Sequence, residues 1–322
     1  LNNDISENEK VQLLFALGKA YEVKKDFKTS FKMYKEGNWI KRKLVKYTSQ
    51  ENTEKVNESI KFFNKHTVNK LNKSKCFDSD PIFILGLPRS GSTLVDQIIS
   101  AHSLVDGTQE LPNIMNLSRE IENLGKGKKA YPEFLTKLSD IQITELGKKY
   151  INQTKWSREE APFFIDKMPN NFMHIGLIKT LLPNAKIIDT RRGAMDTCFS
   201  CFKQFFAKGQ HFTYDLEDLG LFYNDYINIM NHWHDVYPDQ IYTLKYKNMI
   251  SDTENEVKKL LEYCQLPFEA ECLEFYKSKR PVKTPSAEQV RQPIYKSGLD
   301  YWKNFEDDLE PLEMLFGRHI EK

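Results

Sequence analysis

The sequence has no apolar run approaching the ~20 residues that a membrane-spanning helix needs, and its N-terminus shows no signal-peptide pattern. Its 47 basic and 45 acidic residues leave a formal net charge of +2. This balance argues against binding of nucleic acid or of a membrane surface by bulk attraction. Five cysteines without regular spacing form no disulfide framework, so we expect a reducing, cytoplasmic environment. Any anionic ligand must therefore be captured by a local site.

The sequence also lacks a cluster of residues with metal-ligand spacing. His232 and His234 would project from different faces of a helix. Cys198 and Cys201 lie in the middle of an apolar helical pattern, which argues against redox or zinc chemistry. We expect no metal site, and we interpret Cys198, Cys201 and Cys264 as small core residues.

The first 75 residues contain no proline, many lysines and a helical periodicity. Apolar and small residues line one face of two short helices broken near residues 25–26, namely Leu14, Leu17, Gly18, Tyr21, Phe27, Ser30, Phe31 and Tyr34. This order resembles a tetratricopeptide repeat. Because one repeat cannot bury both its faces, we expect the end of a longer array and a protein partner bound through it. An unrelated helical hairpin is the alternative.

A third amphipathic helix is predicted over 52–66, with Val56, Ile60 and Phe63 facing inward, and residues 70–79 read as a linker. Short apolar strands then alternate with helices, which predicts an α/β fold with a P-loop-like parallel sheet flanked by helices. The predicted strands are 82–85, 163–165, 186–188 and 241–244, and the predicted helices are 93–101, 172–181, 195–206, 216–234 and 253–263. We expect a helical tetratricopeptide-like segment over 1–75 and an α/β domain over 76–322.

One loop has the composition of a phosphate-binding site. The strand 82–85 leads into Gly86-Leu87-Pro88-Arg89-Ser90-Gly91-Ser92-Thr93, where a helix begins. Gly86 and Gly91 allow a tight turn with uncovered amides, and the helix N-terminus favours an anion. The two glycines have Walker A spacing, but Ser92 stands where a nucleotidase has lysine. With Arg89 as its cation, the loop suits a donor with fewer charges at its reacting end than ATP.

A second anion site is predicted after a strand over 185–190. Arg192, Asp196 and Ser200 are spaced by four, and Asp196 falls in the first turn of a helix, where the dipole favours a carboxylate. Arg191 precedes this motif directly, so either arginine fits as the anion ligand.

Both segments resemble motifs of the sulfotransferases that use 3′-phosphoadenosine 5′-phosphosulfate (PAPS) and release the desulfated product PAP. For the first segment, the resemblance implies a 5′-phosphosulfate loop made of Arg89, Ser90, Gly91, Ser92, Thr93 and Leu94. For the second, it implies that Arg192 and Ser200 bind the 3′-phosphate and that Asp196 is structural. The family commonly has proline where this chain has Ala194, a small departure.

The resemblance also implies a set of residues at the reacting centre. The stretch before Glu110 resembles that of the tyrosylprotein sulfotransferases, whose base is a glutamate at this spacing, so Glu110 is assigned as general base. His102 is the alternative base, although its place on the loop helix favours a capping or packing role. Lys167 would contact the bridging oxygen of the donor. Three later residues follow family segments that enclose the nucleotide: Ser286 at the phosphosulfate, Lys296 at the 3′-phosphate and Tyr246 near the adenine.

Taken together with the N-terminal repeat, the chain is most similar to proteins that join tetratricopeptide repeats to a sulfotransferase domain. The sequence predicts in-line transfer of a sulfuryl group from PAPS to an acceptor, either a peptide, a carbohydrate or a small molecule, with mild preference for peptide tyrosine. Two alternatives remain: a P-loop nucleotide kinase-like enzyme, and a catalytically inactive scaffold that uses the helical repeat.

Overall fold

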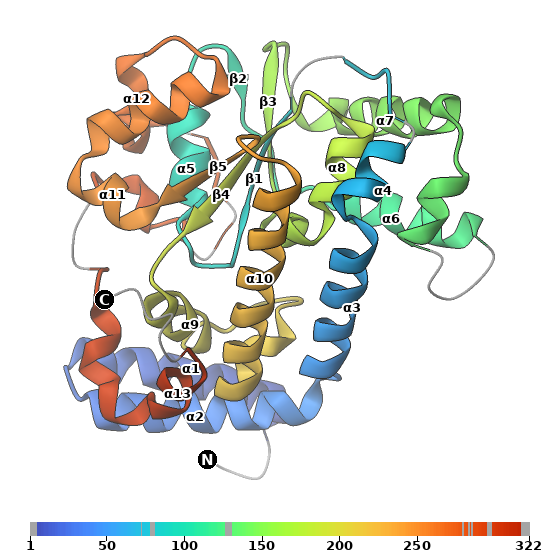
Figure 1. Ribbon diagram of the computed structural model, residues 1–322. Helices are drawn as coiled ribbons and strands as arrows, with labels where there is room; N and C mark the ends of the chain where they lie inside the picture. Colours follow the sequence, from blue (N-terminus) through green and yellow to red (C-terminus); the bar gives the residue numbers. More distant parts are fainter. Residues whose placement is uncertain are drawn as a thin grey trace. The chain divides into compact units, whose positions relative to one another are not determined.

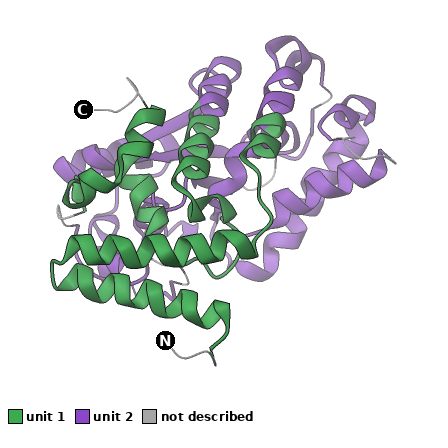
Figure 2. Ribbon diagram, turned by 90° about the horizontal axis from the view of Figure 1, so that it is seen from below, with its two compact units in different colours: residues 1–55, 192–227, 295–322 green, residues 56–191, 228–294 purple. Residues whose placement is uncertain are grey.

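The computed structural model describes residues 5–71, 73–77, 81–125, 131–278, 280–282, 284, 286–294 and 298–316. The chain forms two compact units, which Figure 2 distinguishes by colour. Unit 1 consists of residues 1–55, 192–227 and 295–322, and unit 2 consists of residues 56–191 and 228–294. Each unit is assembled from separate stretches of the chain. The division between 1–75 and 76–322 stays a prediction.

Unit 1 begins with an antiparallel pair of helices, α1 (Glu7–Val23) and α2 (Phe27–Leu44) (Figure 1). Asp26 starts α2 by accepting a hydrogen bond from the backbone N–H of Thr29 (3.1 Å). Gly18 lies against the ring of Tyr34, where a Cβ atom would come within 2.6 Å of a ring carbon. The helical N-terminal segment is confirmed, whereas its identity as a tetratricopeptide repeat stays a prediction.

The buried face of this hairpin differs from the prediction at one position. In α1 the buried residues include Val11, Leu14, Phe15 and Gly18, whereas Leu17 is 38% exposed. Residues 11, 14, 15 and 18 form one helical stripe, and residue 17 lies off it. The prediction that Leu17 faces inward is therefore wrong.

The third predicted helix is two helices, α3 (Ser49–Phe62) and α4 (Lys65–Lys70). The break falls at Asn64, which has an extended backbone and accepts a hydrogen bond from the N–H of Thr67 (3.0 Å). An asparagine in this position starts a new helix, so the prediction of one continuous helix over 52–66 is wrong. Val56 and Phe63 are buried as predicted.

Later stretches of the chain complete unit 1 with α9 (Ala194–Phe202), the first part of α10 (Leu216–Val236), α13 (Glu310–Phe316) and the 3-10 helices η4 (His211–Tyr214) and η8 (Tyr301–Asp308). Aromatic rings join these elements to the hairpin. The ring of Phe31 stacks on that of Phe202 with 5.7 Å between centroids. The rings of Phe27 and Phe199 both contact that of Phe305, with distances of 5.2 and 4.4 Å between the ring centroids. The N-terminal hairpin and α9 thus share one aromatic core.

Unit 2 is built on a five-stranded parallel sheet with the order β2-β3-β1-β4-β5. Its strands are β1 (Pro81–Gly86), β2 (Val105–Asp106), β3 (Phe163–Lys167), β4 (Lys186–Arg191) and β5 (Ile241–Lys245). The four predicted strands and the α/β class are confirmed. The two-residue strand β2 was not predicted, because so short an edge strand has no detectable periodicity.

Helices cover both faces of this sheet (Figure 1). Ile82 and Ile84 of β1 share an apolar core with residues of α5 (Ser92–Ile99) and α12 (Thr253–Cys264). Phe83 points to the other face, where its ring lies 5.7 Å from that of Tyr150 in α7 (Asp140–Thr154). Burial on both faces explains why β1 is apolar without alternation. The other helices of unit 2 include α6 (Asn113–Leu124), α8 (Ile175–Leu181) and α11 (Tyr246–Ser251).

Among the described residues, no helix combines the length and the apolar character that crossing a bilayer would require. All five cysteines are buried, which confirms the prediction that Cys198, Cys201 and Cys264 belong to the core. Within the described part of the chain, no three His, Cys, Asp or Glu side chains gather into a group that could hold a metal ion.

Candidate active site

The parallel sheet of unit 2 brings several predicted site residues to one edge. The loop 86–91 leaves β1 at its carboxyl end, Lys167 is the last residue of β3, and Tyr246 follows β5 directly. Because β1 pairs in parallel with both β3 and β4, and β4 with β5, these carboxyl ends lie at the same edge. Ligands of open parallel sheets bind outside this edge, so the fold alone makes it the candidate site.

The backbone of the loop depends on its two glycines. Gly86 and Gly91 have φ angles of 131° and 104°, which disfavour other residues. A Cβ atom at Gly86 would lie 2.6 Å from the carbonyl oxygen of Thr190, and one at Gly91 would lie 2.8 Å from the ring of Tyr246. Gly91 is also the N-cap of α5, whose start is capped by no side chain among the described residues. The first amides of α5 therefore suit an anion at the loop.

A chain of hydroxyl groups fastens the loop to the sheet. The oxygen atoms of Ser90 Oγ and Thr190 Oγ1 lie 2.7 Å apart, and Thr190 Oγ1 donates to the carbonyl oxygen of Leu85 (3.0 Å). Since the Thr190 proton is used there, Ser90 is the donor to Thr190. The Ser90 side chain thus points at β4 and stabilises the shape of the loop. Leu94 likewise faces inward, with its side chain in the core and its N–H donating to Gly91 O (3.0 Å).

Residues from the segment 280–294 contact the loop. Arg89 donates to Ser286 Oγ (2.5 Å) and to Gln289 Oε1 (3.2 Å). Thr93 Oγ1 lies 3.2 Å from Thr284 Oγ1. The fold therefore brings together Arg89 and Ser286, which sequence reasoning assigned to the same phosphosulfate from opposite ends of the domain. The predicted ligand Lys296 lies outside the described residues.

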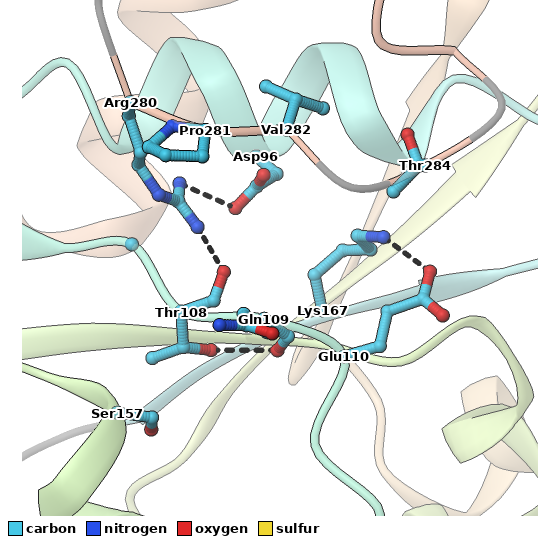
Figure 3. A pocket seen from close by; sticks show the side chains of 11 residues that line it. Asp96, Thr108, Gln109, Glu110, Ser157, Lys167, Arg280, Pro281, Val282 and Thr284 are labelled. Atoms are coloured by element: carbon cyan, nitrogen blue, oxygen red, sulfur yellow. Dashed lines mark hydrogen bonds and ion pairs between the residues drawn. The ribbon is translucent and has the colours of Figure 1, made fainter.

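Glu110 and Lys167, the predicted base and the predicted leaving-group residue, form an ion pair (Figure 3). Lys167 Nζ lies 2.5 Å from Glu110 Oε1. The Lys167 side chain is 5% exposed, whereas that of Glu110 is 46% exposed. The ammonium group is thus held at the end of β3 while the carboxylate remains accessible to an incoming hydroxyl.

This ion pair borders a cavity of about 300 Å³. Figure 3 shows Lys167 and Glu110 on one side of it and Arg280 with Asp96 on another. The remaining lining residues are Gly107, Thr108, Gln109, Ser157, Pro281, Val282 and Thr284. Because Thr284 also contacts Thr93 at the start of α5, the cavity borders the end of the loop that follows β1. This volume lies at the lower end of the range for pockets that bind small ligands.

A buried carboxyl group lies next to Lys167 in β3. Asp166 accepts hydrogen bonds from the Tyr150 hydroxyl (2.6 Å) and from Asn171 Nδ2 (3.4 Å). Burial raises the pKa of Asp166 to about 7, against the lowering effects of the Tyr150 hydrogen bond and the Lys167 charge. This polar group inside the domain fixes the strand that carries Lys167.

The second predicted anion motif lies in unit 1. Arg192 Nη2 lies 3.5 Å from Asp196 Oδ1 and donates to the carbonyl oxygen of Gly298. The other carboxylate oxygen of Asp196 accepts a hydrogen bond from the N–H of Asp300 (3.1 Å). Burial raises the pKa of Asp196. Asp196 thus joins Arg192 to the turn at 298–300, in agreement with the structural role expected for it, while Ser200 lies one helical turn further on and is buried.

The N-terminal hairpin holds the helix that carries this motif. Asn38 Nδ2 donates to the carbonyl oxygen of Phe202 at the end of α9 (2.8 Å). Lys203 Nζ lies 2.8 Å from Glu22 Oε1, and the Tyr34 hydroxyl donates to Glu22 Oε2 (2.8 Å). The buried Glu22 carboxylate therefore connects both hairpin helices to the end of α9.

Arg191, the alternative anion ligand, has a contact of its own in unit 2. Its Nε donates to Asp189 Oδ2 (2.6 Å), and Asp189 is fully buried. A buried carboxylate needs such a partner. This contact favours a structural role for Arg191, so Arg192 stays the predicted phosphate ligand.

His102, the alternative base, is a packing residue. Its Nδ1 accepts a hydrogen bond from the N–H of Leu104 (3.1 Å), so the proton lies on Nε2, which donates to the carbonyl oxygen of Pro267 (2.9 Å). His102 is 2% exposed and does not line the cavity. These contacts confirm the packing role that its position on the loop helix indicated.

Of the residues that line the cavity, sequence reasoning assigned a role only to Glu110 and Lys167, and it missed the charged pair Asp96 and Arg280. Asp96 had a detectable signal, because it is a carboxylate in the middle of an otherwise apolar helical pattern. Arg280 had none, because its partners lie more than 170 residues away in the sequence.

Comparisons with known proteins agree with this geometry. A family model described as "Sulfotransferase family" matches residues 81–270. An uncharacterized protein of Aquifex aeolicus (strain VF5) is 36% identical over 306 residues, which cover 92% of this chain and 40% of that protein. A candidate protein-tyrosine sulfotransferase of Caenorhabditis briggsae is 24% identical over 247 residues, covering 72% of this chain and 84% of that one. The chain thus spans less than half the length of the first of these relatives.

A solved structure shares the fold. The sulfotransferase domain of the Synechococcus PCC 7002 olefin synthase aligns with a TM-score of 0.52 and 18% identity, over 76% of this chain and 97% of that domain. At this identity the likeness concerns the fold alone. The family model matches the sequence itself over residues 81–270, a range that includes the loop, Glu110 and Lys167. The chain belongs to the sulfotransferase family.

Proposed function

We propose that the protein transfers a sulfuryl group from PAPS to an acceptor hydroxyl, which it binds in the cavity beside Glu110. The observation that carries the proposal is the contact between Glu110 and Lys167 at a cavity that borders the end of the phosphate loop. Sulfuryl transfer needs a base for the attacking hydroxyl and a cation for the departing phosphate. This edge of the sheet supplies one of each.

When bound, PAPS supplies an electrophilic sulfur joined through an oxygen to the 5′-phosphate. The acceptor oxygen forms the new bond to sulfur while the bond between sulfur and the bridging oxygen breaks. Glu110 accepts the acceptor proton at its exposed carboxylate. Lys167 stabilises the negative charge that develops on the bridging oxygen, and its burial strengthens that interaction.

The residues around the loop fit an anionic donor. Arg89 brings a guanidinium group into contact with Ser286, and the glycines leave the start of α5 open to an anion. Tyr246 places its ring against Gly91, in agreement with a position near the donor. Arg192 and Ser200 are proposed to bind the 3′-phosphate. Their role is tested separately, by loss of PAP affinity in Arg192→Ala.

Peptide tyrosine is the acceptor that we favour. The support is the resemblance around Glu110 together with the protein-tyrosine sulfotransferase named among the relatives. A nucleotide kinase is disfavoured by Ser92, because a hydroxyl stands where a P-loop kinase needs its lysine.

The proposal is tested with ³⁵S-labelled PAPS and a panel of acceptors: a tyrosine peptide, p-nitrophenol and an amino sugar. We expect transfer to a hydroxyl acceptor that depends on Glu110 and needs no added metal. Transfer of phosphate from ATP to the same acceptors, without transfer of sulfate from PAPS, would contradict the proposal.

A further inference from the structure

We infer that Arg280 is a positioning residue that holds the turn carrying the base Glu110, an inference that rests on the proposed function. The guanidinium group of Arg280 lines the cavity and contacts two different segments of the chain (Figure 3). Its Nη1 lies 3.3 Å from Asp96 Oδ1 in α5, and its Nη2 donates to the carbonyl oxygen of Thr108. Thr108 is two residues before Glu110.

Each partner of Arg280 is itself fixed. Asp96 is 4% exposed and accepts a second hydrogen bond from Gln97 Nε2 (3.1 Å). Thr108 is buried, and its hydroxyl donates to the carbonyl oxygen of Ile165 in β3 (2.5 Å). The turn 107–110 is thus attached to the sheet on one side and to the phosphate-loop helix, through Arg280 and Asp96, on the other.

Gly107 provides the room for this arrangement. A Cβ atom at Gly107 would overlap the guanidinium group of Arg280. The residue before Thr108 therefore has to be glycine for Arg280 to reach both partners. The missing side chain at Gly107 and the position of the Arg280 guanidinium group therefore depend on each other.

The stretch of chain that carries Arg280 also contacts the donor loop, the segment 86–93 that is proposed to bind PAPS. Thr284 lies 3.2 Å from Thr93, and Ser286 accepts a hydrogen bond from Arg89. Arg291 donates to the carbonyl oxygens of Ser278 and Arg280, which fixes the backbone at Arg280. One segment thereby connects the donor loop with the turn of the base, so Arg280 aligns Glu110 with the place where the donor sits.

A positioning residue acts through the group that it positions, and a double-mutant cycle shows this. We would compare Arg280→Met, Glu110→Gln and the double variant by the rate of PAP release from PAPS, with water as the acceptor. We expect Arg280→Met to lower kcat by about 30-fold or more while the Kd for PAP changes by less than about threefold. In the double variant we expect a rate within about threefold of Glu110→Gln alone.

Two further variants separate positioning from general support of the fold. Gly107→Ala keeps the Arg280 charge but blocks its path, so we expect the same loss of kcat, and it stands in for Arg280→Met if that variant does not fold. Added guanidine should restore part of the rate in Arg280→Ala. The matched control Lys258→Met removes an exposed ion pair with Glu254 in α12, and we expect no change in rate.

Independent, multiplying losses in the double variant would overturn the inference, and so would an Arg280→Met enzyme with unchanged kcat. A PAP affinity that falls in step with kcat would also overturn it, because Arg280 would then support the donor site as a whole. Failure of the proposed function is distinguishable, since the unmodified protein would then neither bind PAP nor release it from PAPS.

Discussion

The ion pair between Lys167 and Glu110 predicts unequal effects of two substitutions on stability. Lys167 is 5% exposed and Glu110 is 46% exposed. Glu110→Gln removes the carboxylate from a buried ammonium group, whereas Lys167→Met removes the ammonium from a carboxylate that water still reaches. A hydrogen bond to a charged group contributes about 1.5–3 kcal/mol, and exposure of one partner reduces this. We expect Glu110→Gln to lower the free energy of unfolding by about 1–2 kcal/mol and Lys167→Met by less than about 1 kcal/mol.

The same two substitutions should affect catalysis to a similar, large extent. Loss of a general base or of a group that stabilises developing charge costs about 10²–10³ in kcat. Urea unfolding followed by tryptophan fluorescence measures the stability, and ³⁵S transfer from PAPS measures the rate. The exposed pair Lys258–Glu254 supplies matched controls, Lys258→Met and Glu254→Gln, for which small and equal changes are expected.

Two outcomes would refute this reasoning. If Lys167→Met destabilised the protein as much as Glu110→Gln, the burial of the two partners would not govern the energetics of the pair. If either variant kept more than about a tenth of the activity, the assigned role of that residue would be wrong.

Three further predictions concern other residues of the two units. Arg191→Ala should lower the free energy of unfolding by about 1–3 kcal/mol, since it takes a charged donor from buried Asp189, while PAP affinity measured by calorimetry should fall in Arg192→Ala instead. Burial raises the pKa of Asp166 to about 7. As pH rises from about 4 to 7, Asp166 therefore ionises in the unfolded state before it does so in the folded state, and the free energy of unfolding falls. Urea unfolding should therefore show Asp166→Asn gaining stability relative to the unmodified protein over that window, by up to about 1.4 kcal/mol for each step of one in pH, and a constant difference would contradict the raised pKa. Gly91→Ala, with φ 104° and Tyr246 against its Cβ position, should weaken PAP binding at least about tenfold in calorimetry, and unchanged binding would show that the loop backbone does not contact the donor.

Local patterns were sufficient to predict four of the five strands and the loop after β1. Residues 82–85 form an uninterrupted apolar run because β1 is covered on both faces, and Gly86 and Gly91 mark the turn that follows. Lys167 and Glu110 were assigned from separate motifs, and the fold places them in contact. Each of these features depends on residues close together in the sequence or on a motif with a defined position.

Features that depend on distant contacts could not be predicted. Arg280 reads as an ordinary basic residue, because its role comes from Asp96 and Thr108 at the other end of the domain. Ser90 was assigned to the phosphosulfate loop, but no local pattern showed that its hydroxyl pairs with Thr190 from a neighbouring strand. The link from the N-terminal hairpin to α9 through Glu22 and Lys203 is likewise a tertiary contact without a local signal.

Calorimetric titration of the protein with PAP, ATP and GTP tests the central claim most directly. The loop lacks the lysine of a nucleotidase at Ser92 and carries Arg89 instead. We predict that PAP binds with a Kd at least about 100-fold below that of ATP or GTP, with or without magnesium, a difference of about 2.7 kcal/mol. Tight, magnesium-dependent binding of ATP together with weak binding of PAP would contradict the assignment of this site to a sulfuryl donor.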